Sequence, residues 1–142
     1  MIELIFVIVI IGILASVAIP KLAATRDDAK VSALATNVAN AANEMAAYTV
    51  SRGDTKDNFS AMSRAVEAMI AQNDAVQVGN ILNIKMNTVS DCLQLSVVSS
   101  QYDSNLTIAY GDAGSDTLCK SLQDTIFAED YPIPLKGIRI IR

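Results

Sequence analysis

Histidine is absent from this chain of 142 residues, which removes the commonest general base and the commonest metal ligand. No nucleophile motif and no cluster of metal-ligating residues replaces it, so we predict a protein that is not an enzyme and needs no cofactor. Basic residues form no block and the net charge is −4, which argues against a nucleic-acid partner because phosphate binding uses clustered cations. Aromatic residues are only 5% of the chain, so its 51% hydrophobic content is mainly aliphatic and alanine.

The apolar residues concentrate at the N-terminus. Residues 4–19 read LIFVIVIIGILASVAI, in which only Gly12 and Ser16 are not apolar. A membrane span needs about 17–25 such residues. A secretory signal peptide would have a basic segment before the run and a small-residue cleavage site after it, whereas here Glu3 precedes the run and Pro20 closes it. The buried core helix of a soluble protein is a further alternative, although so continuous a β-branched run is unusual there.

Glu3 is an acidic residue at the edge of this apolar run. A carboxylate inside a membrane costs on the order of 2.5–3.5 kcal/mol at the centre and less near an end, so such residues usually have a partner. The nearest cation is a chain N-terminal amine, either that of the same chain or that of a neighbouring subunit. Alternatively, Glu3 lies at the level of the lipid headgroups and has no further role.

The segment MIELIFVIVIIGILASVAIPKL resembles the N-terminal signature of mature type IV pilins and the related pseudopilins. That family has a glutamate just inside the apolar run, then a glycine, and then a proline that closes the run, and Glu3, Gly12 and Pro20 match these positions. The resemblance covers residues 1–22, roughly a sixth of the chain. Mature pilins usually have Phe-Thr before the position of Met1, and their precursors have a basic leader. We therefore expect that Met1 is not the initiator and that the sequence begins two residues late or has been trimmed.

The resemblance implies an α+β fold, in which the C-terminal half of a long N-terminal helix packs on a small antiparallel sheet. It also implies a structural subunit held in the bacterial inner membrane, processed by a prepilin peptidase and assembled by pilus machinery. The product would be an extracellular helical homopolymer serving adhesion, twitching motility or DNA uptake. The alternative is a type II secretion pseudopilin, whose periplasmic fibre acts as a piston. A membrane-anchored enzyme is a third alternative, which the absences described above disfavour.

The apolar run also suggests how subunits would assemble. Gly12 and Ser16 form a small-xxx-small pair that lets helices approach closely, unless they are bystanders. Twelve large side chains lie in residues 4–19, and their exposure to water would cost about 20–35 kcal/mol. Since Gly12 is a poor helix former and Pro20 lacks an N–H, we predict that residues 12–19 are kinked or locally unwound in the assembled filament.

Three segments are predicted: a membrane and filament-core helix over 1–20, its amphipathic continuation over 21–53, and a globular head over 54–142. Gly53 is the predicted end of the long helix. The continuation shows apolar residues at alternating spacings of three and four, which predicts one buried stripe. The stripe consists of Val31, Leu34, Val38, Ala41, Met45 and Tyr48.

The head sequence predicts a second helix over about 58–72 with Asp57 as its N-cap. Three runs of alternating apolar residues, within 82–86, 93–97 and 106–110, are typical of half-buried antiparallel strands. Ser115 or Asp116 is expected to cap a short helix that contains Leu118, Cys119 and Leu122. Pro132 and Pro134 are expected to interrupt the chain before a final strand over 137–142.

Cys92 and Cys119 are the only cysteines. A disulfide between them resembles the bridged C-terminal region of many pilins and, in the chain-entropy picture, would contribute roughly 3–4 kcal/mol. Two unpaired thiols are the alternative. A catalytic use is disfavoured, because there is neither CxxC spacing nor a histidine partner.

Two weaker motifs lie in the head. Asp112 and Asp116 flank a glycine-containing turn that could bind calcium, as a loop of the major pseudopilins does, although a plain turn with a helix cap explains it equally well. Asn105 begins an Asn-x-Thr glycosylation sequon that follows an acidic residue at position 103, and most such sequons are unmodified.

Overall fold

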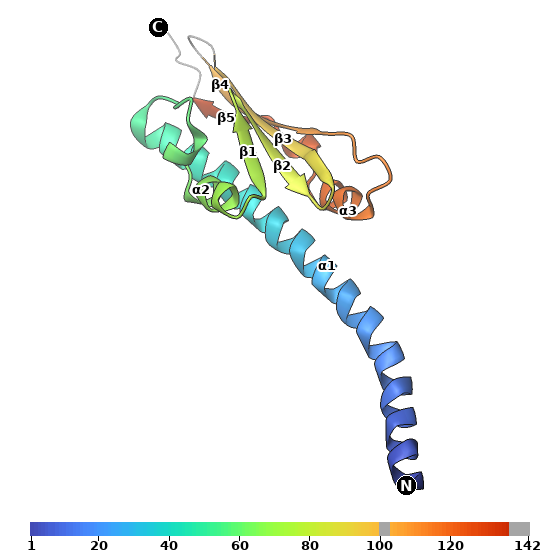
Figure 1. Ribbon diagram of the computed structural model, residues 1–142. Helices are drawn as coiled ribbons and strands as arrows, with labels where there is room; N and C mark the ends of the chain where they lie inside the picture. The colour runs from blue at the N-terminus through green and yellow to red at the C-terminus, as the bar shows by residue number, and fades with distance from the viewer. Residues whose placement is uncertain (100–102, 137–142) are drawn as a thin grey trace, which may run out of the picture.

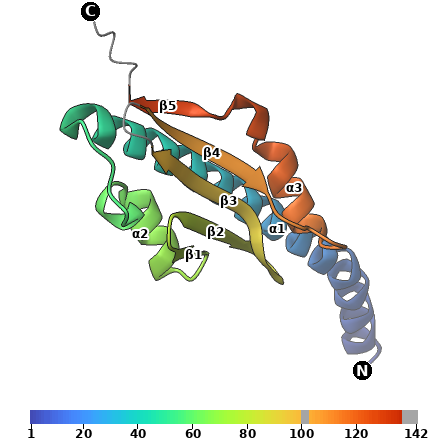
Figure 2. The same ribbon diagram turned by 90° about the horizontal axis from the view of Figure 1, so that it is seen from above.

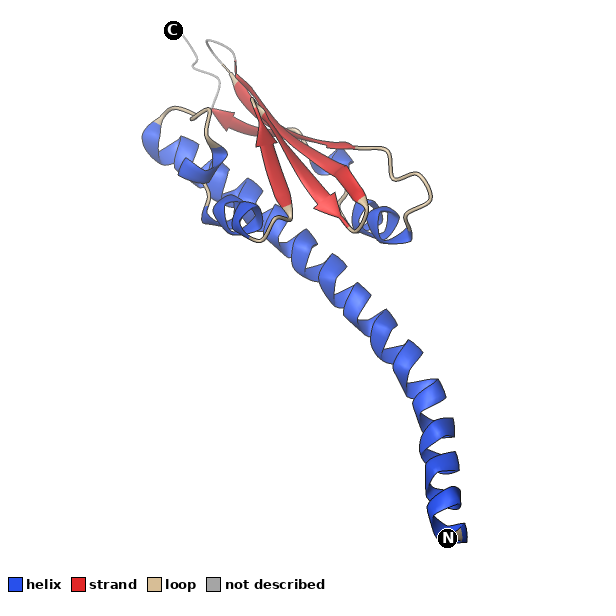
Figure 3. Cartoon of the chain, in the orientation of Figure 1, coloured by secondary structure: helices blue, strands red, loops and turns tan. Residues whose placement is uncertain are grey.

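The computed structural model describes residues 1–99 and 103–136 and has an α+β architecture, with one long helix and a five-stranded antiparallel sheet (Figures 1 and 3). The expected fold class is confirmed. The helices are α1 (Ile2–Arg52), α2 (Arg64–Ala71) and α3 (Thr117–Thr125), with short 3-10 turns η1 (Phe59–Ala61) and η2 (Ala128–Asp130). The strands are β1 (Ala75–Val78), β2 (Ile81–Met86), β3 (Val89–Ser99), β4 (Ser104–Tyr110) and β5 (Ile133–Lys136).

Helix α1 runs for 51 residues without a break and ends where the sequence predicts. Gly53 adopts a left-handed conformation, with φ of 75°, and its N–H donates a hydrogen bond of 2.7 Å to the carbonyl of Thr49. Glycine is the residue that takes this conformation most readily. Pro20 lies inside the helix, and α1 continues through it in the single chain. The kink predicted for residues 12–19 concerns the assembled filament and stays a prediction.

The C-terminal half of α1 buries the predicted stripe against the head. The buried set consists of Val31, Leu34, Ala35, Val38, Ala41, Ala42, Met45 and Thr49. Tyr48 is half-buried and packs at the edge of the same core. The amphipathic spacing therefore predicts the helix face that packs on the sheet.

The sheet is a simple meander with strand order β1-β2-β3-β4-β5. Alternate residues of its central strands are buried in one core with the α1 stripe, as the alternating runs predict. These residues are Leu82, Ile84, Met86, Leu93, Leu95, Val97, Leu106 and Ile108. Tyr110, at the end of the third run, is instead 48% exposed. Its hydroxyl donates to the carbonyl of Ile126 at 2.7 Å and accepts from the N–H of Ala128 at 2.9 Å.

The second predicted helix is wrong in its bounds and in its cap. The segment divides into η1, where the side chain of Asn58 accepts from the N–H of Ser60, and α2, where Ser63 is the N-cap. The carboxylate of Glu44 explains this division. It accepts hydrogen bonds from the Ser63 hydroxyl at 2.7 Å and from the Ala65 N–H at 3.0 Å, so α2 begins where it meets α1.

The expected interruption at the two late prolines is also wrong in part. Pro132 precedes β5, but Pro134 lies within it. In the sheet formed by the described residues, β5 is an edge strand paired with β4, and an edge strand tolerates a residue without an N–H. β1 is a further strand that the sequence pattern did not indicate. The final strand predicted over 137–142 falls outside the described residues.

Cys92 of β3 and Cys119 of α3 form a disulfide, with a Cα–Cα distance of 5.6 Å and both residues fully buried. The predicted pairing is confirmed. Gln123 of α3 adds hydrogen bonds of 2.9 Å to the carbonyls of Cys92 and Gly111. Only glycine fits at position 111, because a Cβ there would lie 1.6 Å from the carbonyl oxygen of Asp91. The disulfide and these contacts hold α3 against β3 and β4.

Candidate assembly surface

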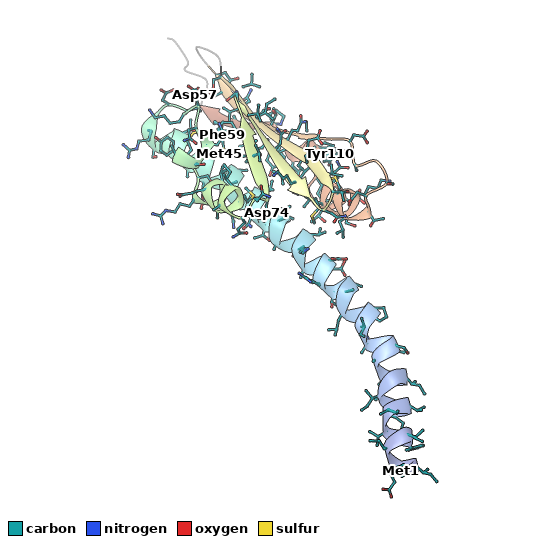
Figure 4. All side chains as sticks on the ribbon, in the orientation of Figure 1. Met1, Met45, Asp57, Phe59, Asp74 and Tyr110 are labelled. Carbon is teal, nitrogen blue, oxygen red and sulfur yellow. A yellow bond between two sulfur atoms is a disulfide. The ribbon has the colours of Figure 1, made fainter. Side chains whose placement is uncertain are left out.

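The N-terminal half of α1 packs against no other element among the residues that the structure describes. Figure 4 shows its side chains spreading in all directions near Met1, whereas Met45 and Phe59 lie inside the head. Every residue from 1 to 26 is exposed except Ala15, which is half-buried. The large apolar side chains among them are Met1, Ile2, Leu4, Ile5, Phe6, Val7, Ile8, Val9, Ile10, Ile11, Ile13, Leu14, Val17, Ile19 and Leu22.

The bare half of α1 is long enough to cross a bilayer. Twenty residues at 1.5 Å each give about 30 Å, the thickness of the hydrocarbon core. Among the residues that the structure describes, α1 is the one helix that meets the length and composition of a span. This architecture is compatible with membrane anchoring.

Three of the predicted assembly residues share one side of this bare helix. Gly12, Ser16 and Pro20 follow one another at spacings of four, so they lie on one slowly turning face. Beyond the adjacent backbone of the helix itself, no described atom comes within 4 Å of where a Cβ on Gly12 would lie. The Ser16 hydroxyl donates to the carbonyl of Ile13 at 2.7 Å, so the helix itself satisfies it. The result is an open strip of small residues that another helix can approach closely.

Glu3 lies in the first turn of α1, where the helix dipole favours an acidic group. It is nine residues before Gly12, which at 3.6 residues per turn places it on the opposite side of the helix. The structure therefore does not bring Glu3 together with the small-residue strip. A helix that used both features would contact different neighbours through its two sides.

The loop that contains Asp112 and Asp116 connects β4 to α3. Hydrogen bonds of Asp116 also join the start of α3 to the β2–β3 turn. One oxygen of Asp116 accepts from the N–H groups of Leu118 and Cys119, each at 3.0 Å, which confirms it as the N-cap of α3. Its other oxygen accepts from the Asn87 amide at 2.7 Å and the Thr88 hydroxyl at 3.0 Å.

These hydrogen bonds, the one from the Cys119 N–H first and the one from Asn87 next, lower the pKa of Asp116 from 3.8 to about 2. Asp112 accepts from the N–H of Gly114 at 2.8 Å, as in an ordinary turn. Within residues 1–99 and 103–136, no three His, Cys, Asp or Glu side chains are grouped closely enough to hold a metal ion. The calcium site stays a prediction without a supporting contact.

Asn105 lies in β4 and is half-buried, between the inward-facing Ser104 and Leu106. Its amide is 3.4 Å from a carboxylate oxygen of Asp103. Glycosylation of this residue is untested and stays a prediction.

Sequence reasoning missed the contact of Glu44 with α2. The hydrogen bonds from the Ala65 N–H and the Ser63 hydroxyl lower the pKa of Glu44. Ser63 followed by an apolar stretch is a capping signal that could have located the start of α2. Nothing in the sequence indicates that Glu44, nineteen residues earlier, would reach it.

Comparison of the chain with models of protein families, with curated proteins and with solved structures gave no match. Its function is therefore inferred from its own residues and their arrangement. The main feature to explain is one continuous helix that is buried in the head at one end and fully exposed at the other.

Proposed function

We propose that this chain is the structural subunit of a type IV pilus, held in the bacterial inner membrane by α1 and then polymerised through α1 into an extracellular filament. One observation carries the proposal. Residues 4–19 of α1 are apolar on all sides and, apart from Ala15, exposed, while the second half of α1 is packed in a head closed by a disulfide. A helix that is apolar all round needs either lipid or other protein around it.

The energetics favour a polymer once the subunit leaves the membrane. Exposure of the large side chains of residues 4–19 to water would cost about 20–35 kcal/mol, at roughly 1.5–3 kcal/mol each. Copies of α1 packed together would cover these side chains without covalent links. In the bilayer this gain is absent because lipid is equally apolar, so extraction needs outside work, which we assign to the pilus assembly machinery.

Glu3 would set the register of the packed helices. A carboxylate at the start of an apolar helix is favourable when a cation neutralises it. The N-terminal amine of a neighbouring subunit would provide that cation and fix how far one helix is shifted along the next. The same contact repeated from copy to copy gives a helical fibre.

A type II secretion pseudopilin is the second candidate, supported by the loop that contains Asp112 and Asp116. Calcium bound in that loop would favour it. Asp116 already accepts four hydrogen bonds, and it would have to give up some of them to bind the ion. The buried disulfide favours the pilus. Isothermal titration with calcium distinguishes the two, because the pilus proposal expects no saturable binding in this loop.

The decisive experiment replaces Glu3 by alanine in the full chain, expressed in a bacterium that has a pilus assembly system. Surface filaments are counted by electron microscopy and membrane-held subunit is measured by immunoblot. We expect Glu3→Ala to abolish filaments while membrane subunit persists, because one small change at the helix start leaves the apolar run intact. Glu67→Ala, at an exposed carboxylate of α2, is the matched control and should leave filaments normal. Normal filament numbers with Glu3→Ala would contradict the proposal.

A further inference from the structure

One aromatic side chain of the head points away from the core. Phe127, between α3 and η2, is 64% exposed. It lies at a groove whose floor includes Ala35 and Ala39 of α1. Glu129 and Asp130 lie two and three residues after it and are both exposed. We call these three residues, Phe127, Glu129 and Asp130, the Phe127 knob: an apolar tip beside two negative charges.

The head also contains a recess with the opposite charge. A cavity of about 410 Å³ opens between α1, the α2–β1 turn and the end of β2. Leu34 and Met86 are buried residues of its lining, and Lys30 and Lys85 contribute two cations against the single carboxylate of Asp74, so the recess is positive on balance. The Lys85 ammonium donates to the amide oxygen of Asn73 at 2.8 Å, which holds it at the recess. We call this the lysine recess; its full lining is Lys30, Ala33, Leu34, Asn37, Gln72, Asn73, Asp74, Lys85, Met86 and Asn87.

The knob and the recess lie on opposite flanks of α1. Ala33 and Asn37 line the recess, whereas Ala35 and Ala39 line the groove beside Phe127. At 3.6 residues per turn these two pairs point in nearly opposite directions. Figure 2 agrees: α2 and β1 lie on one side of α1, and α3 and β5 lie on the other. The knob of one chain therefore cannot enter its own recess.

We propose that the Phe127 knob of one copy inserts into the lysine recess of the next, where Glu129 and Asp130 meet Lys30 and Lys85. The occupant is a second copy of this chain because the two surfaces complement each other in both charge and polarity. This inference rests on the proposed function, and it specifies which surfaces of neighbouring heads meet in the filament. Since the two surfaces differ, the contact is heterologous and leaves a free knob and a free recess at the ends, so it propagates.

The contact also has a direction along the filament. The α1 residues of the recess are centred about three to four positions before those beside Phe127, which is about 5 Å along the helix at 1.5 Å per residue. For copies with parallel α1 helices, each successive head is therefore shifted along the axis. Because each copy is displaced along the axis relative to the one before, the copies form a helix rather than a flat ring.

The first test is zero-length cross-linking of assembled wild-type filaments made from a mixture of isotope-labelled and unlabelled chains. A carbodiimide joins a carboxylate to an amine only when they are in contact. We expect mixed-label peptides that join Glu129 or Asp130 to Lys30 or Lys85. We also expect both lysines to be acylated more slowly in filaments than in detergent-dispersed subunits. Cross-links of these lysines only to other carboxylates, or lysines equally reactive in both states, would overturn the inference.

The second test uses variants of the full chain. Phe127→Ala should lower filament yield at least about tenfold, as truncation of an aromatic anchor in an interface does. Val98→Ala, at a head residue that is 59% exposed, is its control and should have no effect. Lys85→Glu and Asp130→Lys should each lower the yield, and the double variant should restore it, because the pair is re-formed with its charges exchanged.

The outcomes separate this inference from the proposed function. Wild-type chains that form no filament overturn both. Filaments that form normally from Phe127→Ala and Lys85→Glu, without the expected cross-links, overturn only the knob-and-recess contact and leave assembly through α1 standing.

Discussion

The two halves of α1 have the same secondary structure but opposite surroundings. From Val31 to Thr49 one stripe of the helix is buried under the sheet, and the exposed sides have only alanine and small polar residues. From Ile2 to Leu22 no large side chain is covered, and apolar residues occupy every side. The comparison teaches that the second half is stabilised by its own head, whereas the first half depends on surroundings that the chain does not supply. Four predictions test this division.

Deletion of residues 1–19 should have the largest effect, and it should be confined to one half. We expect complete loss of membrane association and of filaments, because the deleted residues hold all but one of the large exposed apolar side chains of the bare helix. The free energy of unfolding of the head should change by less than about 1 kcal/mol, since these residues make no buried contact in it. Flotation on lipid vesicles and chemical denaturation followed by circular dichroism measure the two effects. If the head did not fold after this deletion, the conclusion that it is stable independently of the first half of α1 would be wrong.

A matched pair of leucines tests the same division at single residues. Leu34 is 6% exposed and Leu14 is 65% exposed on the same helix. We expect Leu34→Ala to lower the free energy of unfolding by about 2–5 kcal/mol, because it leaves a cavity in the core. Leu14→Ala should leave head stability unchanged and weaken only the polymer. Urea denaturation and filament yield, measured on both variants, distinguish the roles; equal losses of stability would contradict the division.

Removal of the disulfide should weaken the head alone. The double variant Cys92→Ala with Cys119→Ala should lower the free energy of unfolding by about 2–4 kcal/mol, because the unfolded chain loses its cross-link. Membrane association of α1 should be unchanged. Denaturation of this variant, with vesicle flotation in parallel, measures both. Weaker flotation would mean that the two halves are coupled in a way that the contacts of α1 do not indicate.

Those parts of the fold that follow from periodicity could be predicted from the sequence. Apolar residues recur every three or four positions in the α1 stripe and every second position in the central strands. Each spacing arises because the helix or strand buries one face in the common core. The apolar run from residue 4 to 19 predicts a membrane helix, because it has nearly the length and the composition of a span. Gly53 was predicted because a helix end favours a residue that adopts a left-handed backbone conformation. The cap of α3 was narrowed to Ser115 or Asp116 because a helix start favours a side-chain oxygen that accepts from the backbone, and the structure selects Asp116.

The features that the sequence did not predict depend on contacts between distant residues. The cap of α2 is Ser63 rather than the predicted Asp57, and Ser63 is held by Glu44, which lies on another helix. β5 contains a proline, and it forms a strand because it can pair with the free edge of β4. The lysine recess and the Phe127 knob combine α1 with parts of the chain that are far apart in sequence, so no local pattern indicates them.

The smallest expected effect is a pH dependence at Asp116, which joins α3 to the β2–β3 turn. Its folded pKa of about 2 is below the usual 3.8, so the folded state favours the charged carboxylate. This contribution to stability is complete above about pH 5 and is lost as the pH falls through 3.8 towards 2. Asp116→Asn should therefore melt at a lower temperature than the wild type at pH 7, and the gap should close by about pH 2. Ser115→Ala alters the same loop without removing a charge and should show no such pH-dependent gap. A gap for Asp116→Asn that persists unchanged at pH 2 would mean that the side chain acts through shape rather than charge.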